Sequence, residues 1–248
     1  MELELALDPD DAARLSRLPL LAPLRSGRAQ SRTVRIVWHD SPDRALAERG
    51  LALAEQRPLW RLERLLPDAE SWPPGAPAPV IATARDAAGL GAALPGTLMP
   101  LAAFDGRATA LGLATEQGPL ALTLLNGALR AVTEVQRVGR LRIEGADTAV
   151  QALALALVGE IGIAVPRAGL ATEALAVAAG TSPAPRRLGA PELPAGLSVA
   201  EAFAHVVGHL ADVILWFAPL AAGGHDGPEP VHQMRVAKIG RASCRERV

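Results

Sequence analysis

The sequence predicts an α+β domain followed by an all-α domain. Residues 1–145 contain several short segments in which apolar and polar residues alternate, a pattern typical of half-buried strands. Residues 180–196 are rich in proline, which excludes regular structure there and favours an interdomain linker. Two segments with helical character follow the linker. We therefore expect strands with interspersed helices, then a linker, then a helical hairpin.

The strands are expected where the alternation is clearest. Glu alternates with Leu in residues 1–7, and Val34, Ile36 and Trp38 share one face of a strand over residues 32–40. A strand pair is expected over residues 51–56 and 59–65, before a proline-rich loop at 68–79. Later strands are expected at residues 107–115, 119–125, 129–137 and 140–144.

A hairpin turn is predicted at Asn126-Gly127. This dipeptide lies between two apolar runs, which is a strong signal for a two-residue β-turn. A further turn is expected at Gln117-Gly118. Both turns would join neighbouring antiparallel strands.

The helices are expected where caps and apolar periodicity coincide. Asp8 and Pro9 predict the start of a helix over residues 10–18, as a cap and a first-turn proline. Gly50 is expected to end a short helix that starts at Ser41-Pro42-Asp43. Other helices are expected at residues 148–159, at 197–219 with Ser198 as a possible cap, and from 231 onward.

Composition limits the class of protein. Lys and Arg total 25 against 26 Asp and Glu, so the net charge of −1 gives no general affinity for nucleic acid. The acidic start M-E-L-E-L lacks the basic region of a signal peptide. The apolar stretch 206–222 is interrupted by Gly208, His209, Asp212 and Pro219, and we expect it to be too polar to span a bilayer. We therefore expect a soluble cytoplasmic protein that binds neither nucleic acid nor membrane.

The cations are almost all arginines. Lys238 is the only Lys in the chain, so any earlier phosphate-binding cation must be Arg, whose guanidinium forks bind phosphate well. Cys244 is the only Cys, which excludes an intrachain disulfide and a site of several Cys ligands.

Short segments within residues 1–179 resemble, in sequence order, the CYTH domain of the triphosphate tunnel metalloenzymes. The matching segments are Glu2-Leu3-Glu4, Trp38-His39-Asp40-Ser41-Pro42-Asp43, Leu46, Gly50-Leu51-Ala52-Leu53 and Trp60. The resemblance implies an antiparallel β tunnel or barrel with flanking helices. It also implies an inner wall of Arg and Lys for a triphosphate and of Glu for Mg²⁺ or Mn²⁺. The candidate metal ligands on this basis are Glu2, Glu4 and Glu134.

The chain departs from the family at most of the expected charged positions. Uncharged residues stand where the resemblance calls for Lys, Arg or an acid, at Ala6, Ala54, Gln56, Leu65, Ala103, Leu125 and Leu170, and Gly169 stands where it calls for Ser. The resemblance therefore implies a tunnel that has lost much of its catalytic machinery, and no catalytic residue is assigned.

Several of these residues have a second interpretation. Glu2 and Glu4 could form the solvated face of a terminal strand instead of a metal site. Arg140 and Arg142 could face solvent instead of clamping a phosphate. Four residues of the matching segments are expected to pack or cap rather than bind a ligand, namely Trp38, His39, Asp40 and Trp60.

A second resemblance lies near the end of the chain. Val231-His232-Gln233-Met234-Arg235-Val236-Ala237 resembles the opening signature of the CHAD domain, an antiparallel helical bundle, and this implies polyphosphate binding. His232 and Arg235 are three residues apart and so share one face of a helix, although they could instead pack inside a bundle. Residues 197–238 would form a truncated CHAD domain. Residues 239–248 resemble the in-frame translation of a sequencing adapter, so we expect an adapter-derived tail.

Three functions remain open from the sequence. The leading expectation is a CYTH–CHAD protein that binds inorganic polyphosphate through His232 and Arg235, with a degraded CYTH domain. The alternative is a metal-dependent inorganic triphosphatase that hydrolyses tripolyphosphate with Mg²⁺ or Mn²⁺. The third is a structural partner domain that binds neither phosphate.

Overall fold

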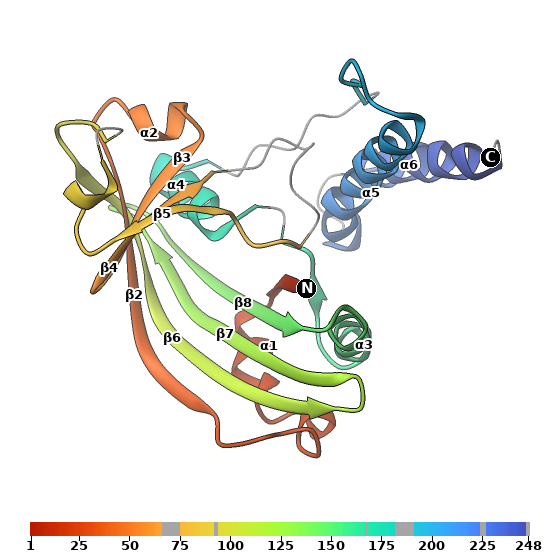
Figure 1. Ribbon diagram of the computed structural model, residues 1–248, viewed down its shortest axis with the longest axis horizontal. Helices are drawn as coiled ribbons and strands as arrows, with labels where there is room; N and C mark the ends of the chain where they lie inside the picture. Colours follow the sequence, from red (N-terminus) through yellow and green to blue (C-terminus); the bar gives the residue numbers. More distant parts are fainter. Residues whose placement is uncertain (66–74, 92–93, 167, 182–190, 224–226, 247–248) are drawn as a thin grey trace. The chain divides into compact units, whose positions relative to one another are not determined.

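The computed structural model describes residues 1–65, 75–91, 94–166, 168–181, 191–223 and 227–246. The chain divides into two compact units (Figure 1). The first comprises Met1–Leu66 and Gly75–Pro183, and the second comprises Pro67–Pro74 and Ala184–Val248. The first unit contains all the strands and the second contains two long helices.

A nine-stranded antiparallel sheet forms the first unit, with the strand order β5-β4-β3-β2-β6-β7-β8-β1-β9. The long strands β2, β6, β7 and β8 curve together through the middle of the sheet (Figure 1). The strands are β1 (Glu2–Leu7), β2 (Gln30–Asp40), β3 (Leu51–Gln56), β4 (Leu59–Arg64), β5 (Val80–Ala84), β6 (Met99–Thr115), β7 (Gly118–Arg130), β8 (Val135–Gly145) and β9 (Ile163–Ala164). The antiparallel sheet with flanking helices that the sequence predicts is therefore present.

The two faces of the sheet carry separate hydrophobic cores, because successive side chains of a strand point to opposite faces. On the outer face, Leu122 and Leu141 are buried together with residues of α1 (Pro9–Leu15) and α3 (Asp147–Val158). On the inner face, Phe104 and Leu129 are buried with residues of α4 (Leu170–Ala179). The inner face is thus only partly covered by helix, which leaves room for a cavity.

The sheet approaches closure without completing a ring of strands. The edge strands β5 and β9 do not pair with each other among the described residues. The segment before β5 spans the gap, since Glu4 N donates to Gly75 O at 2.6 Å and Arg64 N donates to Pro79 O at 3.0 Å. Proline has no N–H group, so this proline-containing segment cannot pair as a regular strand. A tunnel-like interior therefore forms, with an irregular segment as part of its wall.

The predicted hairpin at Asn126-Gly127 is wrong. Both residues lie inside β7, where Gly127 pairs with Gly106 on β6 and with Val138 on β8. A Cβ atom on Gly127 would lie 2.6 Å from Gly106 Cα and 2.9 Å from the Phe104 ring. Glycine is needed here because the two strands approach closely under that ring, and not because of a turn. The chain instead turns between β7 and β8, where Ala131 N donates to Glu134 O at 2.9 Å.

The strand expected over residues 129–137 is also wrong, because it spans the turn between β7 and β8. Most other predicted elements are confirmed, with shifted ends. The Asp8 carboxylate caps α1 by accepting from Asp10 N at 2.8 Å, as its position predicts. The Asp40 carboxylate caps α2 (Ala45–Glu48), because it accepts from Leu46 N and Ala47 N, each at 2.9 Å. Strand β6 begins eight residues earlier than expected. The strands β5 and β9, the helix α4 and two short 3₁₀ helices, Pro19–Leu21 and Ala88–Leu90, were not predicted.

The second unit is a pair of helices, α5 (Val199–Gly223) and α6 (Glu229–Glu246). Val213, Trp216, Phe217 and Ala237 form its buried cluster. Ser198 caps α5 as predicted, since Ser198 N donates to Glu201 Oε2 at 2.8 Å and Glu201 N donates to Ser198 Oγ at 3.3 Å. The helix continues through Pro219, where we expected it to end.

One helix segment, Val199–Ala218, is long and apolar enough to cross a membrane by length and composition. This differs from our expectation that the overlapping stretch 206–222 is too polar for a bilayer. A single such segment is weak evidence for a membrane span, because core helices of soluble proteins and signal sequences pass the same test.

The glycine contact between β6 and β7 yields a test of the fold. Gly127→Ala should lower the free energy of unfolding by about 1–3 kcal/mol, because the added methyl group overpacks the space under Phe104. Gly27→Ala is the matched control, since a Cβ there meets no atom within 4 Å. Its effect should stay within about 0.5 kcal/mol. Urea unfolding of both variants measures the difference, and equal stabilities would contradict the close approach.

Candidate anion-binding cavity

A cavity of about 590 Å³ lies against the inner face of the sheet. This volume falls within the range of small-molecule sites, about 300–1,000 Å³. Its wall comes from β1, β2, β3, β4, β6, β7 and β8, from the segment before β5, and from the first residues of α4. Its charged lining residues are Glu2, Glu4, Glu63, Arg32, Arg61, Arg140 and Arg142.

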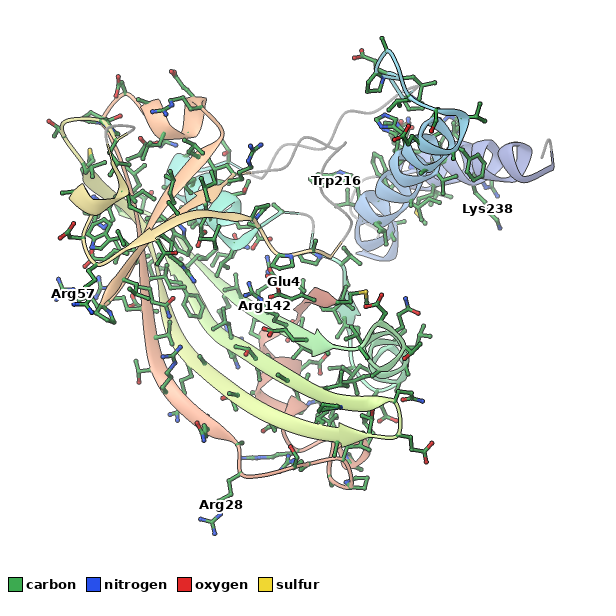
Figure 2. All side chains as sticks on the ribbon, in the orientation of Figure 1. Glu4, Arg28, Arg57, Arg142, Trp216 and Lys238 are labelled. Atoms are coloured by element: carbon green, nitrogen blue, oxygen red, sulfur yellow. The ribbon has the colours of Figure 1, made fainter. Side chains whose placement is uncertain are left out.

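The alternation of the strands places these charges on one face. Glu2 and Glu4 are two residues apart on β1, and Arg140 and Arg142 are two residues apart on the neighbouring β8. The register sets Glu4 opposite Arg142, so the two acids and the two arginines form adjacent rows. Figure 2 shows Glu4 and Arg142 close together, whereas the labelled Arg28 and Arg57 point away from the sheet.

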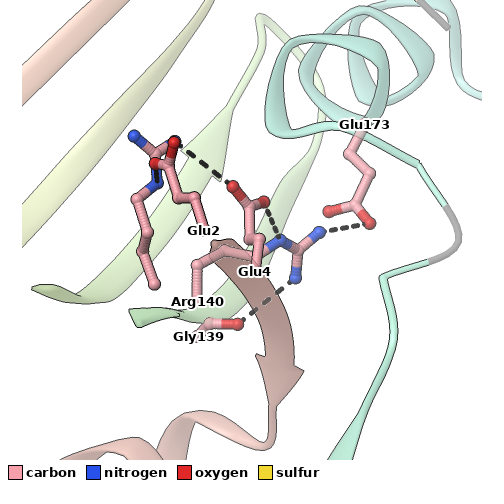
Figure 3. A network of polar contacts seen from close by, with 6 residues as sticks. Glu2, Glu4, Gly139, Arg140 and Glu173 are labelled. Carbon is pink, nitrogen blue, oxygen red and sulfur yellow. Dashed lines mark hydrogen bonds and ion pairs between the residues drawn. The ribbon is translucent and has the colours of Figure 1, made fainter. Parts of the chain in front are cut away.

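An ion-pair network joins the two rows (Figure 3). Arg142 Nε lies 3.0 Å from Glu2 Oε1, and Arg142 Nη2 lies 3.4 Å from Glu4 Oε2. Arg140 Nε lies 3.5 Å from Glu4 Oε1, so Glu4 is shared between both arginines. The network makes the carboxylates internal partners of the arginines.

Arg140 is the most deeply buried cation of the cavity. Its side chain is only 7% exposed, and its Nη2 lies 2.5 Å from Oε1 of Glu173, on the first turns of α4. Its Nη1 donates to Gly139 O at 3.2 Å. The contacts of Nε and Nη2 with the two carboxylates lack hydrogen-bond geometry, so these atoms have no hydrogen-bond partner among the described residues. Two ion pairs and the single hydrogen bond to Gly139 O therefore hold Arg140 in place.

Two other walls also carry buried polar groups. On β4, Arg61 Nε lies 3.2 Å from Glu63 Oε1 without a hydrogen bond. On β2, the indole Nε1 of Trp38 is buried and has no acceptor within the described part of the chain. A buried donor without an acceptor destabilises the fold, so these groups favour a polar occupant of the cavity or a local rearrangement.

Burial raises the pKa of the Glu63 carboxyl above its ordinary value of 4.5. Arg61 and Arg142 oppose this rise, and the negative charge of Glu4 adds to it. The influence of Glu4 and Arg142 shows that β4 faces the β1–β8 rows electrostatically. A proton therefore binds Glu63 more readily than an exposed glutamate.

The predicted site residues separate in the structure. Glu2 and Glu4 line the cavity, and Glu4 is buried, so the interpretation of Glu4 as part of a solvated face is wrong. Arg140 is also buried, so its solvent-facing interpretation is wrong, whereas Arg142 is partly exposed. Glu134 is exposed in the turn after β7 and lines a different pocket with Gln136 and Thr181. The structure thus brings Glu2 and Glu4 together without Glu134.

Several residues that line the cavity or contact its lining were not predicted as site residues. Arg61 and Glu63 lie two apart in β4, which is a signal that strand alternation could have supplied. Glu173 carried no signal, because α4 itself was not predicted. His39, expected beside Asp40, instead contacts Glu55 Oε2 through Nε2 at 3.1 Å and packs on the Trp60 ring at 4.8 Å between centroids. Trp38 is buried as expected, and its ring also lines the cavity.

The carboxylates have suitable chemistry for a metal ion, because hard divalent cations prefer oxygen ligands. Within the described ranges, however, no three His, Cys, Asp or Glu residues are grouped so that they could hold one. The lining glutamates contact arginines instead. As arranged, these residues do not fit a resident metal ion.

Comparison of the sequence with profiles of protein families gives no match, and neither does comparison with curated protein sequences. Similar folds occur among solved structures. One is HpAC1 from Hippeastrum, described as a candidate adenylyl cyclase with a dominant triphosphatase activity. It has 15% identity and a TM-score of 0.46, over 73% of this chain and 95% of that one.

Two candidate adenylate cyclases are also similar. The Bacillus halodurans protein has 14% identity and a TM-score of 0.31, over 63% of this chain and 86% of that one. The Vibrio parahaemolyticus protein has 13% identity and a TM-score of 0.30, over 64% and 84%.

Glu63 and Glu55 should make the stability of the protein depend on pH in opposite directions. The raised pKa of Glu63 means that, above about pH 4.5, the folded protein keeps a proton that the unfolded chain has lost. Stability contributed by Glu63 should therefore fall as pH rises from 4.5 through the raised pKa. The pKa of Glu55 is lowered by its hydrogen bond from Arg57, so its contribution is present above pH 4.5 and is lost as pH falls below it.

The measurement is urea unfolding of the wild type, Glu63→Gln and Glu55→Gln between about pH 3 and pH 8. The stability of the wild type relative to Glu63→Gln should decrease with rising pH. Relative to Glu55→Gln it should increase. If the two stability differences changed with pH in the same direction, burial would not disfavour the charged form of Glu63, and this assignment would be refuted.

Proposed function

We propose that the first unit binds a linear inorganic phosphate chain, such as tripolyphosphate, in the cavity on the inner face of the sheet. The observation that carries this proposal is the lining itself. Four arginines and three glutamates face one cavity of about 590 Å³, and one of the arginines, Arg140, is almost fully buried there. Exposed arginines of a solvated surface would not be gathered in this way.

The arginines suit a phosphate chain for a physical reason. A guanidinium group presents planar donors that match two oxygens of a phosphate, and its charge is permanent. Arginines on β2, β4 and β8 reach the cavity from different sides, so successive phosphoryl groups can each contact a different cation. The absence of Lys before residue 238 is therefore no obstacle to binding a triphosphate.

Binding would proceed as an exchange of partners. In the structure Glu2, Glu4 and Glu173 neutralise Arg140 and Arg142. Phosphoryl oxygens that enter the cavity would replace these carboxylates at the guanidinium groups. A divalent cation that arrives with the phosphate chain would meet the displaced carboxylates as a counter-ion of the substrate. This arrangement supports binding, and hydrolysis of tripolyphosphate is the alternative function.

A charge-removing substitution in the cavity tests binding. Arg142→Gln should weaken tripolyphosphate binding about tenfold or more, because one charge-assisted hydrogen bond to phosphate is lost. Isothermal titration calorimetry with and without Mg²⁺ measures the affinity. Arg28→Gln is the control, since Arg28 is exposed and does not line the cavity. Equal losses in both variants would show only non-specific attraction and would refute the site.

An assay of phosphate release separates binding from hydrolysis. We expect tripolyphosphate to bind without phosphate release, because the described residues offer no group of three His, Cys, Asp or Glu side chains that could hold a catalytic metal ion. Phosphate release is assayed with Mg²⁺ or Mn²⁺ in the wild type and in the Glu2→Ala/Glu4→Ala double variant. Release by the wild type that the double variant abolishes would establish the triphosphatase alternative.

For the second unit we propose a weaker contact with polyphosphate through His232 and Arg235. Both side chains are exposed and lie three residues apart on α6, so they can contact one phosphate chain from one helix face. His232→Ala/Arg235→Ala should lower the affinity for long-chain polyphosphate and leave tripolyphosphate binding unchanged. Filter binding at two salt concentrations measures this. An unchanged polyphosphate affinity would remove the second unit from the proposed function.

A further inference from the structure

We propose that the end of the cavity at α4 is a subsite for the terminal phosphoryl group of the chain, and that Glu173 is an internal carboxylate that occupies it until the ligand arrives. This inference rests on the proposed function and deepens it. It places the terminal phosphoryl group of the chain beside α4, and Glu173 competes with that group for Arg140.

The proposed subsite contains a buried cation, Arg140. Arg140 is 6% exposed and lines the cavity, yet its Nε and Nη2 make no hydrogen bond within the described residues. A guanidinium taken out of water needs both a counter-charge and acceptors for its N–H groups. Glu173 and Glu4 supply the charge without the hydrogen-bond geometry. A ligand whose oxygens are free to orient would satisfy Arg140 better than these tethered carboxylates do.

The start of α4 also lies at the proposed subsite. Gly169, Leu170 and Ala171 line the same cavity, and no side chain caps this helix. The first N–H groups of a helix have no partner within it, and together with the helix dipole they attract anions. Within the described residues, the backbone N–H groups of Leu170 and Ala171 donate to no acceptor. The subsite therefore combines a buried guanidinium with backbone donors.

The position of α4 explains why the subsite takes a terminal group. Helix α4 packs on the inner face against β2, β3, β6 and β7, and its first residues form part of the cavity wall. A linear phosphate chain directed at these residues would end at the helix. A terminal phosphoryl group has three non-bridging oxygens, one more than an internal group, and so can accept from Arg140 and from the helix amides together.

Glu173 lies one turn further along α4. It is not a lining residue of the cavity, but its carboxylate contacts Arg140, which is. Its Oε1 lies 2.5 Å from Arg140 Nη2. Its carboxylate stands in for the anionic oxygens of a phosphoryl group. A ligand must displace it, so the Glu173–Arg140 ion pair opposes binding. The same pair neutralises Arg140 while the cavity holds no ligand.

The experiment compares the wild type with Glu173→Gln and Glu116→Gln by calorimetric titration with orthophosphate, pyrophosphate and tripolyphosphate. Glu173→Gln keeps the shape of the side chain and removes its charge. Glu116→Gln removes the same charge from an exposed turn that does not line the cavity. Glu173→Gln should bind tripolyphosphate about tenfold more tightly than the wild type, because the competitor of a charge-assisted contact is gone. Glu116→Gln should bind like the wild type.

Thermal unfolding supplies a second readout. Glu173→Gln should unfold at a lower temperature than the wild type, since Arg140 loses a counter-charge, and tripolyphosphate should raise its unfolding temperature by more than that of the wild type. A lower unfolding temperature with no gain in affinity would mean that Glu173 is only structural, and would overturn the inference while tripolyphosphate binding stands. A gain for orthophosphate alone would overturn the assignment to a chain end. No binding of any phosphate by any of the three proteins would refute the proposed function as well.

Discussion

The buried guanidinium of Arg140 is the constraint on which the interior of the first unit depends. A permanent charge inside a protein must be neutralised, and its counter-charges here come from two distant parts of the chain. Glu4 lies on β1 and Glu173 on α4, so the ion pairs tie the first strand and the last helix of the unit to β8. Both the Glu173–Arg140 ion pair and apolar packing therefore hold α4 over the inner face.

This constraint explains why the inner face differs from the outer face of the same sheet. Leucine and isoleucine side chains of β7 and β8 that face α1 and α3 form an uninterrupted apolar core. Their inward neighbours are instead Thr123, Leu125, Arg140 and Arg142, which line the cavity. A helix packed fully over those arginines would strip them of water without adding acceptors. Partial coverage by the short α4 leaves the cavity open beside the charged rows.

Local patterns in the sequence were sufficient for the parts of the fold that depend on alternation and caps. The face shared by Glu2 and Glu4 and the caps at Asp8 and Ser198 were predictable, because each depends on residues close in sequence. The true role of Gly127 was not predictable, because glycine is needed there to make room for the ring of Phe104 on the neighbouring strand. Arg140 was ambiguous for a similar reason. An alternating strand specifies which residues share a face, and only the long-range register decides which face is enclosed.

The charge balance of the cavity also determines what kind of ligand it can select. Its arginines and glutamates nearly cancel, so long-range attraction of anions is weak and selection must come from contact. A single small anion can replace only one carboxylate at one guanidinium, and then the remaining ion pairs still hold. A chain of linked phosphoryl groups replaces several carboxylates in one binding event, because the second and third contacts become intramolecular once the first has formed. Near-neutrality of the lining thus favours a linear phosphate chain over separate phosphate ions, even though both carry the same chemical group.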